Sequence, residues 1–225
     1  DPLWSRGLGD VYKRQAFPTD NGWQATTLCQ QVFGGHGYIR EAGMEQYVRD
    51  ARINMIYEGT NAVQALDLLG RKVLGNNGAT LKKFGKRVAA LVEAEGVNED
   101  MAEFINPLAY LGEQMTKFTM ELGFKGSQNP DEVGAAAVDY LRVAGHLVFA
   151  YLFARSAQVA LRQIAAGNED PFYRAKLQTA RFYFAKLFPE TASLMRTARA
   201  GSGALMDTDA ALALSLIHIS EPTRP

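Results

Sequence analysis

The chain has little cysteine, little histidine and no excess of either charge, and these shortages exclude several classes of protein. Cys29 is the single cysteine, so no disulfide can form within the chain, and a reducing compartment is expected. Lysine plus arginine number 24, as do aspartate plus glutamate, which leaves no basic surplus for nucleic acid or an anionic membrane. We therefore predict no nucleic-acid partner, and we expect Cys29 to be a small core residue.

The sequence also lacks an apolar run long enough to cross a membrane. The longest run, Val143–Ala154, is interrupted by His146 and bracketed by Arg142 and Arg155. A membrane span needs about 20 apolar residues, so this run predicts a buried core helix and no membrane span. With 47% hydrophobic and 21% charged residues in 225, the composition is that of a globular protein with a sizeable core.

Alternating apolar stretches, the pattern of strands, are missing as well, and helical periodicity takes their place. Thr19-Asp20 should cap the first helix, and the glycines of GNNG (75–78) should end the third. Pro107 is expected at the start of a helix, and Pro189 should kink or break another. The predicted helices cover 22–33, 41–53, 62–74, 79–95, 106–124 and 131–166, with a last one from 171. The prediction is an all-α chain whose second half is an up-and-down helical bundle.

Both ends of the chain differ from the rest of the sequence. Residues 1–15 (DPLWSRGLGDVYKRQ) and 215–225 (SLIHISEPTRP) share no periodicity with their neighbours. Both resemble translated sequencing-adapter read-through, which predicts that they are non-native tails. We therefore expect the native chain to continue on the N-terminal side of Ala16, which would make this chain a fragment.

A glycine-rich loop, Gly34-Gly35-His36-Gly37, follows the first predicted helix. Such loops bring the backbone close to a ligand and can present N–H groups to an anion. The loop does not follow a strand, which argues against a dinucleotide-binding Rossmann turn. A helix C-cap with a turn explains the glycines equally well. His36 has no second histidine or cysteine at ligand spacing, so it is expected to be an ordinary loop residue, and no metal site is predicted.

Glu58 is a single carboxylate in the short segment MIYEGTNAVQ, Met55 to Gln64. The segment is too short for a helix of its own, and Thr60-Asn61 can cap the helix that follows. A carboxylate in an apolar, poorly hydrated setting has its pKa raised, which makes it a stronger base near neutral pH. A simple loop acid and a catalytic base are both consistent with this pattern.

The stretch from Gln31 to Leu74 resembles the C-terminal helical domain of flavin-dependent acyl-CoA dehydrogenases. Three blocks carry the likeness, in this order and spacing: QVFGGHGY, RDAR and YEGTN. The upstream AFPTDNGWQAT also fits the helix that precedes the loop in that family. The resemblance implies α,β-dehydrogenation of an acyl-CoA thioester, with Glu58 as the base that removes the α proton and hydride transfer to FAD.

The same resemblance implies roles for the neighbouring residues and for partners. Glu58 and Gly59 would contact substrate, because in the family the backbone N–H at the glutamate donates a hydrogen bond to the thioester carbonyl, and Gly59 would let the substrate pass close to the main chain. The residues implied in FAD contact are Gln31, Val32, Phe33, Gly34, Gly35, Thr60, Asn61 and Ala62. The first five would act across a subunit interface, so a homo-oligomer is expected, with an electron-transfer flavoprotein as electron acceptor and the bacterial cytoplasm as location.

The second half resembles the extra C-terminal domain of longer bacterial members, a group that includes 3-methylmercaptopropionyl-CoA dehydrogenases. This divides the chain into residues 16–75, from the catalytic helical domain, and 79–213, the extra domain, which would act in subunit packing or as a lid. The family's N-terminal helical domain and middle β-domain have no counterpart here, so the isolated chain is expected to bind FAD poorly and to turn over no substrate. A fragment of an acyl-CoA oxidase and a non-catalytic helical interaction module are the alternatives.

Overall fold

The computed structural model describes residues 3–57 and 59–207, with side chains for 16–57, 59–79 and 81–207. Every regular element in this part of the chain is helical, which confirms the all-α prediction. The elements are α1 (Leu3–Val32), η1 (Gly34–Gly37), η2 (Arg40–Ala42), α2 (Met44–Ile53), α3 (Asn61–Leu66), η3 (Asp67–Val73), η4 (Leu74–Asn76), α4 (Ala79–Glu95), η5 (Glu99–Met101), α5 (Ala102–Gln128), α6 (Asp131–Ala165), α7 (Pro171–Phe182), η6 (Tyr183–Leu187), α8 (Glu190–Ala198) and α9 (Gly203–Met206).

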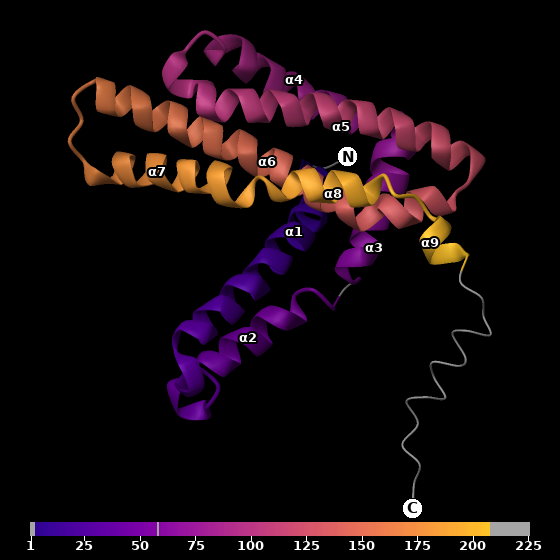
Figure 1. Ribbon diagram of the computed structural model, residues 1–225, viewed down its shortest axis with the longest axis horizontal. Helices are drawn as coiled ribbons and strands as arrows, with labels where there is room; N and C mark the ends of the chain where they lie inside the picture. Colours follow the sequence, from indigo (N-terminus) through magenta and orange to yellow (C-terminus); the bar gives the residue numbers. More distant parts are fainter. Residues whose placement is uncertain (1–2, 58, 208–225) are drawn as a thin grey trace, which may run out of the picture.

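The second half is an up-and-down bundle in which α6 is the central helix (Figure 1). At 35 residues α6 is long enough for α7 and α8 to pack against it one after the other, while α5 covers another side and α4 packs on α5. Pro189 lies between α7 and α8, and the chain before it loosens into the π-helical turn η6. The break predicted at Pro189 is confirmed, because a proline in that position cannot supply an N–H to the preceding turn.

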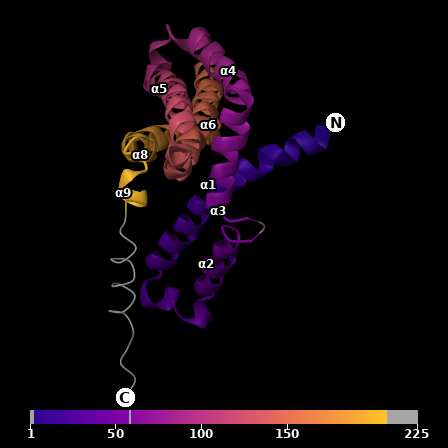
Figure 2. The ribbon, with the colours of Figure 1, turned by 90° about the vertical axis from the view of Figure 1, so that its right-hand side faces the viewer.

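The first half forms an arm made of α1 and α2, which pack side by side and project away from the bundle (Figures 1 and 2). The loop at the tip of the arm contains η1 and η2, and the chain returns along α2 toward the bundle. From there α3 and η3 run along α6, with Ala65, Leu69 and Val73 buried in the joint core. Asn77 and Gly78 then adopt left-handed conformations (φ of 54° and 72°), which ends this stretch within the predicted 75–78 segment.

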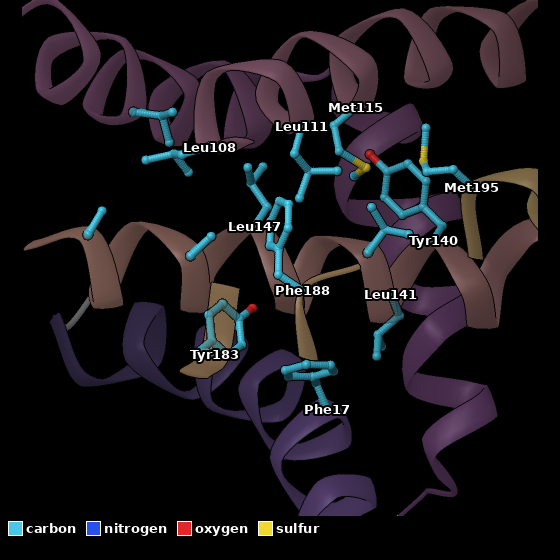
Figure 3. Close-up of a cluster of buried hydrophobic side chains, with 14 of the residues drawn as sticks. Phe17, Leu108, Leu111, Met115, Tyr140, Leu141, Leu147, Tyr183, Phe188 and Met195 are labelled. Carbon is cyan, nitrogen blue, oxygen red and sulfur yellow. The ribbon is translucent and has the colours of Figure 1, made fainter. Parts of the chain in front are cut away.

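Phe17 joins the arm to the bundle. Its side chain is 2% exposed and meets the rings of His146 and Phe149 on α6 edge to face, with centroids 4.9 and 5.0 Å apart. Figure 3 shows Phe17 pointing from α1 toward α6. Burying a phenylalanine contributes about 2 kcal/mol relative to leaving it in water, so this residue is a main anchor of the arm.

Three details differ from the sequence-based expectations. α1 does not start at Thr19-Asp20 but continues through Pro18, and the Thr19 hydroxyl bonds the Ala16 carbonyl (3.1 Å) instead of capping a helix. α5 begins at Ala102, so Pro107 lies inside the helix, because η5 already starts the turn upstream. Cys29 is exposed and is not a core residue, since no element of the described chain covers its side of α1.

α6 is the one helix in the described residues that is long and apolar enough to cross a membrane by length and composition. Its position explains this apolar character, because α5, α7 and α8 all pack on it. It also buries the polar side chains of His146 and Gln158. These contacts agree with the prediction of a core helix over Val143–Ala154.

Candidate functional site

The glycine-rich loop lies at the tip of the arm, and its backbone requires two of its glycines. Gly34 has a φ of +58°, which side-chain-bearing residues rarely adopt. Gly37 is buried, and a Cβ there would lie 2.3 Å from the Gln30 carbonyl oxygen. The Gln30 side chain also donates to the Gly37 carbonyl (3.1 Å), which fastens the loop to the end of α1. The five predicted FAD contacts of the loop, Gln31, Val32, Phe33, Gly34 and Gly35, are all exposed.

The second group of predicted site residues lies at the other end of the arm, where α3 begins. Glu58 lies outside the described residues. Gly59 follows it with a φ of +94° and is exposed, as are Thr60 and Ala62. Thr60 occupies the N-cap position of α3, but its side chain makes no capping hydrogen bond, contrary to the capping role expected from the sequence.

Asn61 is the exception in this group, because its side chain turns toward α1. Its amide nitrogen donates to the Ala16 carbonyl (3.1 Å), the Thr19 hydroxyl (3.1 Å) and the Asp20 carboxylate (2.6 Å). Its backbone N–H donates to the carbonyl of Met55, six residues earlier in the chain (3.2 Å). The side chain is therefore committed to the fold, and its predicted contact with FAD stays a prediction.

The two groups are not brought together within one chain. Asn61 contacts Asp20, and the first residue of the other group, Gln31, lies eleven helical residues further along α1. A helix rises by about 1.5 Å per residue, which separates the groups by about 16 Å or more. Figure 1 shows the loop at the outer tip of the arm and the start of α3 beside the bundle.

The arm exposes much of its apolar surface. α2 buries none of its residues, although its sequence is amphipathic. Eleven large apolar side chains between 28 and 66 are exposed: Leu28, Val32, Phe33, Tyr38, Ile39, Tyr47, Ile53, Ile56, Tyr57, Val63 and Leu66. Such a concentration of exposed apolar side chains in one segment is typical of an interface with another domain or chain.

Two buried polar clusters in the bundle were not identified from the sequence. In the first, the His146 ring contacts the Tyr183 hydroxyl (Nδ1 to OH, 3.0 Å) and Glu190 (Nε2 to Oε2, 3.3 Å), and Arg142 pairs with Glu190. Burial lowers the pKa of His146, although the Glu190 carboxylate opposes this shift. Burial likewise raises the pKa of the Tyr183 phenol. The only sequence signal was a histidine inside the apolar run Val143–Ala154.

The second cluster surrounds Glu95 at the end of α4. This carboxylate is 5% exposed and accepts hydrogen bonds from Gln158, Asn98 (2.9 Å) and Arg162 (2.7 Å). The bonds from Gln158 and Asn98 are the largest causes that lower the pKa of Glu95. Asn98 lies three residues further along the chain, whereas Gln158 and Arg162 lie on α6, so the cluster joins α4 to α6. In the described part of the chain no group of three or more histidine, cysteine, aspartate or glutamate side chains could hold a metal.

Comparison with known proteins identifies both halves of the chain. Residues 16–74 match the family profile described as acyl-CoA dehydrogenase, C-terminal domain. Residues 84–209 match the profile described as acetyl-CoA dehydrogenase C-terminal like, which alone covers more than half of the chain. The chain belongs to the acyl-CoA dehydrogenase family.

Curated relatives of this acyl-CoA dehydrogenase chain include 3-methylmercaptopropionyl-CoA dehydrogenase of Ruegeria pomeroyi, 35% identical over 179 residues, which is 78% of this chain and 30% of the relative. A broad-specificity linear acyl-CoA dehydrogenase of Mycobacterium tuberculosis is 26% identical over 86% of this chain and 33% of its own length. A butyryl-CoA dehydrogenase of Syntrophomonas wolfei is 28% identical over 86% of this chain and 32% of its own length. The chain therefore spans about a third of the length of these relatives.

Proposed function

We propose that this chain is the C-terminal part of an FAD-dependent acyl-CoA dehydrogenase that forms an α,β double bond in an acyl-CoA thioester. The observation that carries the proposal is the exposed apolar arm, which joins the Tyr57–Ala62 segment to the loop of Gln31–Gly35. Because α2 has no buried residue, the arm leaves apolar side chains exposed that a further surface would cover. In a longer polypeptide that surface would be the remaining domains, with residues 16–75 completing the catalytic domain and 79–213 forming an additional one.

The residues present fit a flavin nucleotide in most respects. The loop from Gln31 to Gly35 is exposed, and added Cβ atoms on Gly34 or Gly35 would have no neighbour within 4 Å. A ligand can therefore approach this backbone closely. Thr60 and Ala62 are exposed at the start of α3, where backbone N–H groups favour an anionic group. Asn61 fits less well, because its amide already bonds α1.

The proposed chemistry divides the two hydrogens of the substrate between protein and cofactor. FAD, when bound, accepts the β hydrogen with its electron pair. Glu58 takes the α proton onto its carboxylate, and the electron pair of that C–H bond becomes the second bond between the α and β carbons. Because the α C–H is a weak acid, the site must exclude water and stabilise the charge that develops on the thioester carbonyl. Covering the exposed Ile56 and Tyr57 with a further domain would remove that water.

The separation of the two predicted FAD groups supports a shared site between copies of the chain. One chain would place Thr60 and Ala62 near its own flavin, and the loop of Gln31–Gly35 would reach the flavin of a second copy. This arrangement would make the enzyme a homo-oligomer, with the two groups of each chain at opposite ends of its arm. An electron-transfer flavoprotein is proposed as the acceptor of the electrons.

The test is anaerobic reduction of bound FAD by acyl-CoA in the completed enzyme, expressed from the whole parent gene. Glu58→Gln should keep stoichiometric FAD and lose flavin bleaching by about a thousandfold or more, because proton abstraction by a positioned base supplies about 10²–10⁴-fold. Glu41→Gln is the matched control, since Glu41 is an exposed acid near the tip of the same arm. Near-normal bleaching in Glu58→Gln would show that the base is assigned to the wrong residue.

A further inference from the structure

We propose that the helical bundle of the second half positions the segment that follows Glu58, and that Phe17 and Asn61 are the positioning residues that connect the two. The connection has two steps on neighbouring turns of α1. Phe17 fixes α1 on α6, and Asn61 fixes the start of α3 on α1. The catalytic consequence of this connection rests on the function proposed above, whereas the connection itself can be tested in the isolated chain.

The first step depends on a close fit between Phe17 and Gly145 of α6. A Cβ on Gly145 would lie 2.3 Å from Cγ of Phe17 and 2.6 and 2.7 Å from its Cδ atoms. Real side chains do not approach so closely, so Phe17 can hold this position only because residue 145 is glycine. The rings of His146 and Phe149 also contact the Phe17 ring, in edge-to-face geometry.

The second step is made by the neighbours of Phe17 on α1. Ala16, fully buried beside it, offers its carbonyl to the Asn61 amide, and Thr19 and Asp20 accept from the same amide one turn later. A shift of Phe17 therefore moves the acceptors of Asn61 as well. These contacts join residues 41 to 45 positions apart in the sequence.

Asn61 then limits the loop that carries Gly59 and Thr60. Its backbone N–H bonds the Met55 carbonyl, so both ends of the loop over 55–61 are held by one residue. Gly59 adopts a φ of +94° and lies close to α3, since a Cβ there would lie 3.0 Å from Nε2 of Gln64. Further along the chain, α3 and η3 pack against α6, with Ala65 and Leu69 buried in the core. The loop is therefore set from α1 on one side and from α6 on the other.

Such a connection matters for catalysis because proton transfer is sensitive to position. Displacement of a reacting group by about 1 Å can reduce a rate by about a hundredfold. The helical bundle of the second half would then hold the segment that follows Glu58 in position, a role that requires no contact between the bundle and substrate.

The connection is tested first in the 225-residue chain by hydrogen exchange. Gly145→Ala should increase exchange of the amides of 59–66 about tenfold, since an overpacked contact favours local opening. Gly134→Ala is the matched control, because Gly134 is also on α6 but a Cβ there has no neighbour within 4 Å. In a Phe17→Ala background, which itself loosens the segment, Gly145→Ala should have no further effect. Equal exchange of 59–66 in Gly145→Ala and Gly134→Ala would overturn the proposal.

The catalytic role is tested in the completed enzyme with the same pair of variants and with Asn61→Ala. Gly145→Ala should lower kcat about tenfold or more while KM and FAD content change less than about twofold, and Asn61→Ala should lower kcat to a similar extent. Their pH profiles for flavin reduction should also shift, which loss of global stability alone would not produce. An inactive wild-type enzyme would count against the proposed function. An active wild type with unchanged kcat in Gly145→Ala and Asn61→Ala would count against the positioning role.

Discussion

The ring of His146 and the hydroxyl of Tyr183 are hydrogen-bonded to each other inside the helical bundle of the second half. The Tyr183 hydroxyl is 3.0 Å from Nδ1 of His146 and 3.1 Å from the His146 carbonyl oxygen. When the Tyr183 hydroxyl donates its hydrogen bond to the His146 carbonyl, Nδ1–H of the ring donates to the hydroxyl oxygen. In the neutral ring Nε2 then carries no proton, and it lies 3.3 Å from the Glu190 carboxylate. The same ring supports Phe17, so the network lies where the arm joins the bundle.

This network predicts that folding stability falls in mildly acidic solution. Burial lowers the pKa of His146 below its ordinary 6.5, so the unfolded chain binds a proton more readily than the folded chain. The contribution of the neutral ring is present above about pH 6.5 and is lost as the pH falls through the lowered pKa. Urea unfolding of the isolated chain between pH 7 and 5 should show this loss.

His146→Gln should remove that pH dependence because glutamine does not titrate. It should also cost about 1–3 kcal/mol at pH 7, since a well-packed ring is lost from beside Phe17. His36→Gln is the control, because His36 is exposed in the loop at the tip of the arm. If the free energy of unfolding of His146→Gln still falls between pH 6.5 and 5, the pH dependence belongs to other groups.

The hydrogen bonds around the buried Glu95 carboxylate lead to a second prediction, on folding stability. Glu95→Gln should reduce the free energy of unfolding by about 1–3 kcal/mol, because an amide nitrogen would face donors that now bond a carboxylate. The chief donors are Gln158 and Asn98, since the Arg162 side chain is largely exposed. Glu93→Gln, an exposed change on the same helix, should have no measurable effect.

The lowered pKa of Glu95 also predicts that acid reduces folding stability. Its contribution is present above the ordinary carboxyl pKa of 4.5 and is lost as the pH falls through the lowered value. The stabilities of wild type and Glu95→Gln should therefore converge as the pH falls from 4.5 through the lowered pKa of Glu95. Curves that stay parallel down to the acid limit would mean that the Glu95 charge does not stabilise the fold.

The loop at the tip of the arm gives a third prediction. Gly37→Ala should open the loop, because the new Cβ would lie 2.3 Å from the Gln30 carbonyl, and backbone atoms cannot move aside cheaply. Gly35→Ala should be tolerated, since a Cβ there has no neighbour within 4 Å. In hydrogen exchange, the amides of 33–40 should lose protection about tenfold or more in Gly37→Ala alone. Equal protection in the two variants would contradict the close packing of Gly37.

Cofactor affinity gives a fourth prediction. The isolated 225-residue chain should retain little FAD after purification, because the two predicted FAD groups lie apart and the apolar arm lacks a covering surface. Absorbance of the purified chain at the flavin band measures this directly. Stoichiometric FAD would mean that the described residues, or an assembly of them, already form the whole flavin site.

Helix positions followed well from the sequence where local rules decide them. The apolar periodicity around Leu69 and Val73 and the breaks at Gly78 and Pro189 were correctly identified, because each depends on residues within a turn or two. Thr19 and Cys29 were interpreted wrongly for a different reason. Both belong to an α1 that continues through Pro18 and projects from the bundle, which no local pattern indicates.

The candidate site followed from the sequence only as a set of motifs. The glycine loop and the Gly59–Ala62 segment were recognisable, but their separation along the arm depends on the length of α1. The bonds of Asn61 to α1 and the fit of Phe17 against Gly145 join residues far apart in the sequence. Such contacts are set by packing between elements, and a single sequence carries no periodic signal for them.

The central claim, that this chain is one part of a flavin-dependent dehydrogenase, is tested most directly by a long sequencing read through the parent locus. The account predicts an open reading frame that continues upstream of Ala16, in frame, for several hundred codons and encodes a β-rich middle domain. A genomic start codon just before Ala16, or a genome that encodes residues 1–15 as they stand, would contradict it and favour a helical interaction module.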